Sequence, residues 1–126
     1  MKKLLISLLL GFAMTAQADN VMTKTKDGTY IINTTTLAQD VEGYAGATPL
    51  EVHIKKNTIV KVVVLKNQDG PKYNAKVKKQ MLPIYEGMNV KKGTVQDVDA
   101  VTGATFTSKA MQENIRRAVD YYKKHK

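Results

Sequence analysis

The chain has 126 residues and a formal net charge of +9, and it contains no cysteine and no tryptophan. The absence of cysteine excludes a disulfide scaffold, a thiolate nucleophile and a thiolate zinc site, and two histidines are too few for a His-rich site, so we expect no metal. Aromatic residues make up only 6 % of the chain, which argues against a basic groove that stacks single-stranded nucleic acid, and we expect no nucleic-acid partner.

The first 18 residues have the three parts of a secretory signal peptide. Lys2 and Lys3 give a positive start, Leu4–Met14 is a short apolar stretch, and two alanines then fit an A-x-A cleavage site. The apolar stretch is too short to span a bilayer, which takes about 20 residues. We therefore predict a signal peptide over residues 1–18 and one small exported domain over residues 19–126. Removing 18 residues from 126 leaves 108, and losing two lysines lowers the net charge from +9 to +7.

Three segments in the first half of the domain have the composition of strands. A short strand is predicted at Tyr30–Ile32. From Leu50 to Ile54, apolar and polar residues alternate, which is typical of a strand with one buried face. After a turn at 55–58, residues 59–65 are apolar and mostly β-branched apart from one lysine, and this pattern predicts a central strand. The last two strands form a predicted hairpin.

Two helices and one further strand are predicted after the turn residues Asn67–Pro71. Residues Tyr73–Leu82 fit a middle helix that Pro83 interrupts, and Val95 and Val98 fit another strand. The clearest helix is the last one, in which apolar residues recur at three- and four-residue spacings: Met111, Ile115, Ala118, Val119 and Tyr122. Together the elements predict an α+β fold, a small single domain whose antiparallel sheet, with a central hairpin, packs against a C-terminal amphipathic helix and a shorter middle helix.

A hydroxyl-rich stretch, Asp99–Ser108, lies at the start of the last helix. Gly103 permits a backbone conformation or a close approach that a Cβ would prevent, and Ala104 keeps the stretch thin. Thr107 or Ser108 fits the N-cap, and the free N–H groups beyond it form a site where a phosphate would be held. Taken alone, the same pattern is also typical of a helix cap with no ligand.

The order of residues in this stretch resembles an attachment motif. Asp-x-x-Thr-Gly-Ala-Thr, followed by x-Thr-Ser and an amphipathic helix, is similar to the motif of exported FMN-binding domains, which also occur in a subunit of the sodium-pumping quinone reductase and in related ferredoxin-linked membrane complexes. In that family a flavin transferase, using FAD and a magnesium ion, joins FMN through its phosphate to the last threonine. The resemblance implies that FMN is the cofactor and that this threonine is Thr105. The residues that match the rest of the motif are Asp99, Thr102, Gly103, Ala104, Thr107 and Ser108.

The resemblance extends upstream through less specific residues and covers Glu42–Tyr122. Gly43, Tyr44 and Gly46 are similar to the family's glycine-rich entry into its hairpin, where the backbone lies close to the flavin. After the hairpin the family commonly has Glu-Thr-Pro-Gly, whereas this chain has Gln68–Pro71. The loop is kept, but the ring contacts of the usual residues are not carried over.

A second Gly-Ala-Thr sequence ends at Thr48. Ala45 stands where the motif needs Ser or Thr, and Pro49 biases Thr48 toward an extended conformation with no helix start behind it. We therefore interpret Thr48 as the start of a strand and not as a second attachment site.

The resemblance implies an exported flavoprotein that carries FMN through a threonine phosphoester and relays electrons between membrane or extracytoplasmic redox partners. No general base, activated nucleophile or substrate pocket is evident, so an electron carrier is favoured over a complete enzyme. The alternatives are a non-catalytic binding or interaction module of the same fold, with FMN bound non-covalently or absent, and a reductase for a small extracellular acceptor. The sequence does not decide between a periplasmic and an extracellular location.

Charged side chains add two further expectations. Asp99 would repel a nearby phosphate, so we expect it to serve recognition by the flavin transferase or by its magnesium ion. The dispersed lysines are interpreted as a solvated surface, or alternatively as a patch for an anionic membrane surface or an acidic partner.

Overall fold

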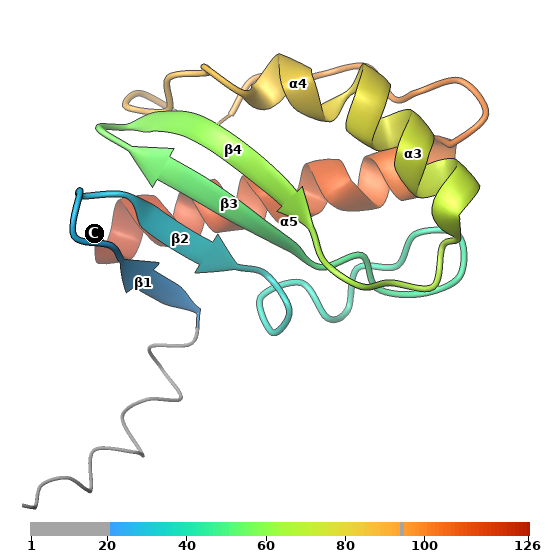
Figure 1. The fold of residues 1–126 in the computed structure, drawn as a ribbon, viewed down its shortest axis with the longest axis horizontal. Helices are drawn as coiled ribbons and strands as arrows, with labels where there is room; N and C mark the ends of the chain where they lie inside the picture. The colour runs from blue at the N-terminus through green and yellow to red at the C-terminus, as the bar shows by residue number, and fades with distance from the viewer. Residues whose placement is uncertain (1–20, 94) are drawn as a thin grey trace, which may run out of the picture.

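A four-stranded antiparallel sheet forms one layer of the structure (Figure 1). The computed structural model describes residues 21–93 and 95–126, so the predicted signal peptide at 1–18 lies outside the described residues. The strands follow one another along the sheet in chain order, each antiparallel to the next. They are β1 (Met22–Lys24), β2 (Tyr30–Asn33), β3 (Leu50–Lys55) and β4 (Thr58–Val64).

The hairpin of β3 and β4 follows the predicted pattern. Alternate residues of β3, from Leu50 to Ile54, are fully buried, and the residues between them are half-buried. Lys56 and Asn57 form the turn, with φ angles of 52° and 62°. A two-residue turn with positive φ at both positions matches the right-handed twist of the flanking strands. The predicted hairpin is therefore confirmed.

β4 is the last strand of the sheet and not the central strand that its composition predicts. Val60 is 46 % exposed, and the register of β4 against β3 shifts at one point. The start of its outer edge is covered, because the N–H of Ile59 donates to the Met88 carbonyl at 2.9 Å and the N–H of Gly87 donates to the Ile59 carbonyl at 2.6 Å. β-Branched residues are favoured wherever a strand is partly buried, whether or not it has a strand on both sides. Here the segment at Gly87 and Met88 covers part of β4 in place of a further strand.

In the described part of the chain, three helices accompany the sheet: α3 (Pro71–Gln80), α4 (Leu82–Tyr85) and α5 (Thr105–His125). α5 crosses behind the sheet and contacts β2 and β3, while α4 contacts β4 and α3 contacts α5 (Figure 1). The apolar stripe of α5 is buried as predicted, and Val52, Met111 and Ile115 are fully buried between helix and sheet. The predicted α+β domain, with its C-terminal amphipathic helix and shorter middle helix, is confirmed.

Local details differ from the prediction at three places. The middle helix ends at Gln80, and Pro83 lies in the first turn of α4, where the missing N–H of a proline breaks no hydrogen bond. Val95 and Val98 lie in an irregular connection and not in the predicted strand, and Val95 is buried there as part of the core cluster. The strand β1 is not predicted, since one half-buried and two exposed residues give no readable alternation.

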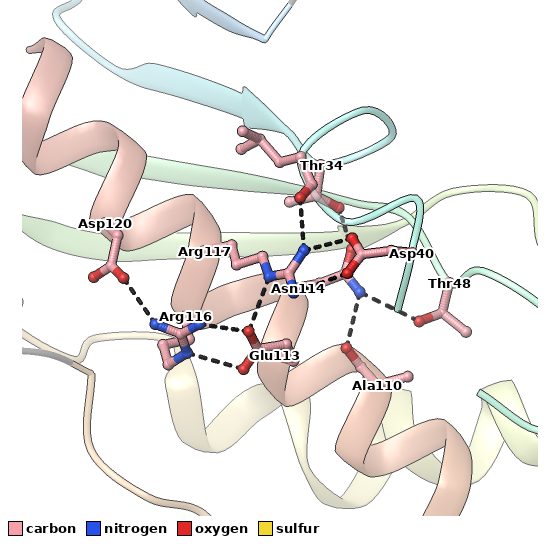
Figure 2. A network of polar contacts seen from close by, with 10 residues as sticks. Thr34, Asp40, Thr48, Ala110, Glu113, Asn114, Arg116, Arg117 and Asp120 are labelled. Carbon is pink, nitrogen blue, oxygen red and sulfur yellow. Dashed lines mark hydrogen bonds and ion pairs between the residues drawn. The ribbon is translucent and has the colours of Figure 1, made fainter. Parts of the chain in front are cut away.

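Polar contacts fix the connection between β2 and β3 to α5 (Figure 2). The Asn114 side chain is fully buried; its amide nitrogen donates to the Thr48 hydroxyl at 3.5 Å, and its oxygen accepts from the Thr34 hydroxyl. Nearer the surface, Arg117 forms an ion pair with Asp40 at 2.6 Å. The connection is therefore held along α5 by a buried amide and an outer ion pair.

Candidate functional site

α5 begins at Thr105, earlier than the sequence predicts. The N-cap is Ala104, with φ −145° and no side-chain cap hydrogen bond, so the prediction of an N-cap at Thr107 or Ser108 is wrong. Gly103 turns the chain into the helix with φ +86°, a conformation that favours glycine. The first backbone bond of the helix runs from the Ser108 N–H to the Ala104 carbonyl at 2.9 Å. The earlier N–H groups of the helix have no intrahelical acceptor and suit an anion.

Thr107 and Ser108 are buried in the first turn, where their hydroxyls bond within the protein. The Ser108 hydroxyl accepts from the Val101 N–H at 3.0 Å, which holds the preceding loop against the helix. The Thr107 hydroxyl donates to the Asp69 carboxylate at 2.6 Å. Both side chains therefore fix the loop in place instead of capping the helix.

The Asp69 carboxylate joins three segments at this end of the molecule, although the residue is only 2 % exposed. It accepts hydrogen bonds from the N–H groups of Tyr44 (2.8 Å) and Ala45 (2.7 Å) as well as from Thr107. Burial by itself raises the pKa of the Asp69 carboxyl, but these hydrogen bonds outweigh burial and lower the pKa below its ordinary value. Asp69 is therefore ionised. From its place between β4 and α3, it links the segment between β2 and β3 to the first turn of α5.

The two predicted glycines, Gly43 and Gly46, differ in what surrounds them. A Cβ on Gly43 would lie 2.1 Å from a carboxylate oxygen of Asp69, so only glycine leaves room for that carboxylate. A Cβ on Gly46 would meet nothing within 4 Å. The N–H of Gly43 donates to the Gly46 carbonyl at 2.7 Å and closes the turn that presents its N–H groups to Asp69.

An open cavity of about 250 Å³ lies between this turn, α3 and the start of α5. Two aromatic rings, Tyr44 and Tyr73, line it with their centroids 5.1 Å apart and their planes at 43°. Residues 103–107 form the α5 side, and Phe106 is 65 % exposed there. Thr105 is exposed and lines the cavity, so a reagent in solution has access to its side chain.

The other predicted residues take separate positions. Asp99 and Thr102 are exposed on the connection that leads to α5, and neither lines the cavity. Thr48 is fully buried beside Asn114 and is closed to solvent. The cavity thus brings together five of the predicted residues: Tyr44, Gly103, Ala104, Thr105 and Thr107.

Three residues of this region escape the sequence analysis: Asp69, Tyr73 and Phe106. Asp69 stands out in the sequence only as a departure from the family's usual Glu-Thr-Pro-Gly and as an aspartate ahead of a Gly-Pro turn. Its partners lie 24 to 38 residues away in the sequence, which no local pattern can indicate. Tyr73 and Phe106 carry no signal beyond their aromatic character.

Metal-binding and membrane-spanning features are both missing from the part of the chain that the structure describes. Within residues 21–93 and 95–126, no three His, Asp or Glu side chains cluster closely enough to hold a metal ion. No helix in the same ranges is long and apolar enough to cross a membrane.

A surface cavity with aromatic walls at the open N-terminal end of a long helix suits an organic phosphate with a planar ring system. Residues 43–120, more than half of the chain, match the family model of the FMN-binding domain, and the chain belongs to this family. FMN is accordingly the cofactor of the domain. Neither the curated proteins nor the solved structures give a match to the chain.

The residues around the cavity fit FMN. The first turn of α5 contains no acidic residue, so its N–H groups suit the phosphate. Tyr44 and Tyr73 offer ring faces for the isoalloxazine. The cavity, at about 250 Å³, is smaller than the roughly 300–1,000 Å³ of pockets that enclose a drug-sized ligand. FMN bound here therefore keeps part of its surface in contact with solvent.

Replacing Gly43 with alanine tests the room left for Asp69. Gly43→Ala forces the Asp69 carboxylate away from the turn, and we expect the free energy of unfolding to fall by about 1–3 kcal/mol because the N–H groups of Tyr44 and Ala45 lose their charged acceptor. Gly46→Ala is the matched control and should change the free energy of unfolding by less than about 1 kcal/mol, since its Cβ meets open space. Urea unfolding followed by circular dichroism measures both variants, and equal losses would contradict this account.

The pH dependence of stability tests the ionised state of Asp69. A carboxyl whose pKa is lowered by folding stabilises the native state fully above its unfolded pKa of about 3.9 and loses this effect as the pH falls through the folded value. We expect Asp69→Asn to lower the free energy of unfolding by about 1–3 kcal/mol between pH 5 and 7, with the gap to wild type closing below about pH 4. The exposed Asp97→Asn is the control. An undiminished gap at pH 3 would show that ionisation of Asp69 is irrelevant.

Proposed function

We propose that this protein is an exported flavoprotein that carries FMN covalently on Thr105 and relays electrons between membrane or extracytoplasmic redox partners. One observation carries the proposal: within a domain of the FMN-binding family, Thr105 is exposed, lines the aromatic cavity and begins α5. The predicted signal peptide over residues 1–18 supports export.

Exposure and a place on the cavity wall together separate Thr105 from the other threonines that are candidates for attachment. Thr48 and Thr107 are buried and engaged in internal hydrogen bonds. Thr102 is exposed, but it does not line the cavity. Thr105 alone among these four combines solvent access with a position on the cavity wall.

The attachment step exchanges one phosphate bond for another. The Thr105 hydroxyl oxygen bonds to the FMN phosphorus of FAD, the bond between the two phosphates of FAD breaks, and AMP leaves with the hydroxyl proton in the overall balance. A flavin transferase that uses FAD and magnesium is the partner for this maturation. The chain itself contributes the accessible hydroxyl of Thr105. The N-terminal end of α5 also stabilises the single negative charge of the phosphodiester product by about 0.3–1 kcal/mol.

Covalent attachment suits a carrier that works outside the cytoplasm. A phosphoester link abolishes dissociation, which acts like a very high effective concentration of the cofactor. The isoalloxazine supplies one- and two-electron chemistry when bound, and the protein retains and orients it. The open cavity leaves ring surface accessible for transfer during collisions, and the lysine-rich surface favours encounter with anionic partners.

Intact mass spectrometry tests the attachment site. When the mature protein is co-expressed with a flavin transferase, we expect wild type to gain the mass of FMN minus one water and Thr105→Ala to gain none, because the ester needs the hydroxyl. Thr102→Ala, which removes the neighbouring exposed hydroxyl, is the matched control and should be loaded like wild type. Flavin fluorescence on a denaturing gel separates covalent from non-covalent FMN. A full mass gain in Thr105→Ala would show that FMN is attached at another residue. A colourless wild type would favour the alternative of a non-catalytic binding or interaction module.

Asp99 is proposed to act during maturation and not in the finished site. Its side chain is exposed and does not line the cavity, and a carboxylate close to a phosphodiester would repel it. We expect Asp99→Asn to slow flavin transfer at least tenfold while leaving the absorbance spectrum of the loaded protein unchanged, as recognition of the transferase or its magnesium requires the charge. A time course of intact mass checks the rate; transfer at the wild-type rate would remove Asp99 from this role.

A further inference from the structure

Lys76, on α3, lies against the loop that leads into α5. A Cβ on Gly103 would be 2.8 Å from the Lys76 ammonium nitrogen, so this cation lies close beside the backbone of the Thr102–Thr105 turn. Lys76 is half-buried, unlike the exposed Lys78 and Lys79 of the same helix. Within residues 21–93 and 95–126, none of the ion pairs involves Lys76.

The position of Lys76 brings two positive groups together. The N-terminal end of a helix carries roughly half a positive charge, and α5 has neither an acidic residue in its first turn nor a side-chain cap to balance it. An ammonium group beside that end adds to the positive potential. An anion near the Lys76 ammonium and the start of α5 would be attracted by both positive groups. The proposed function puts such an anion, the FMN phosphate, on Thr105.

We propose that Lys76 is the positioning residue for the phosphate of FMN on Thr105. This inference rests on the proposed function and adds the group that holds the anion beside the loop at Gly103. The ammonium group pairs with the phosphate, and the N–H groups of α5 bind it from the other side. Because Lys76 helps the loaded protein only, its removal leaves the apoprotein no less stable.

The test measures both loading and the stability gained by loading. Purified apoprotein is incubated with flavin transferase, FAD and magnesium; intact mass gives the transfer rate, and melting temperatures are recorded before and after transfer. We expect Lys76→Gln to be loaded about two- to fivefold more slowly and to gain less in melting temperature on loading than wild type. The deficit should disappear at about 1 M salt because the pair is screened.

Two further variants keep the test specific. Lys78→Gln removes an exposed charge from the same helix, beside a different surface depression, and should match wild type. Lys76→Arg keeps the charge and should recover the melting-temperature gain. An apoprotein of Lys76→Gln that melts below the wild-type apoprotein would assign Lys76 to packing and overturn the proposal.

The remaining outcomes also decide the matter. A slower transfer with an unchanged melting-temperature gain would place Lys76 in the transferase contact and overturn the proposal, as would a Lys76→Gln variant that equals wild type in both measurements. Wild type that gains no mass at all would instead refute the proposed attachment on Thr105. Failure of the inference and failure of the proposed function are thus distinguishable.

Discussion

The buried carboxylate of Asp69 is the interaction on which the cavity depends. It takes hydrogen bonds from the turn at Gly43–Gly46 and from Thr107 in the first turn of α5, and so joins segments that are far apart in the chain. A charge buried to this extent is tolerable only when such donors surround it. The arrangement also explains the need for glycine at position 43, because any Cβ there would occupy the place of a carboxylate oxygen.

The cavity follows from this junction. With Thr107 turned inward to Asp69, Thr105 lies on the solvent side of the same turn, next to the rings of Tyr44 and Tyr73. The buried Asn114 holds the β2–β3 connection at a second point of α5 (Figure 2). Together with Asp69, it fixes this connection to the helix at two polar junctions. Aromatic walls, an exposed hydroxyl and free N–H groups thereby meet at one place.

Local patterns in the sequence predicted much of this. The alternation in β3 and the apolar stripe of α5 gave the sheet, the long helix and the α+β class, because burial on one face imposes a period that can be read directly. The hydroxyl-rich stretch also suggested a phosphate site at the start of the last helix, whereas Thr105 itself was indicated by the resemblance to the family motif. The N-cap was predicted at the wrong residue because the partner of Thr107 is Asp69, which lies 38 residues away. The edge position of β4 and the aromatic wall formed by Tyr73 likewise depend on tertiary contacts that no window of sequence contains.

Because α5 begins at Thr105, the packing of this helix determines where a group bonded to Thr105 would lie. The helix runs for 21 residues, and its inner face is embedded in the core through residues such as Met111 and Val119. A group esterified to Thr105 would therefore be attached to a helix that is packed into the core, and its ester oxygen would be held by one short β-branched side chain. The point of attachment would therefore keep a fixed place relative to the sheet, and a partner would meet it at the same end of the molecule each time.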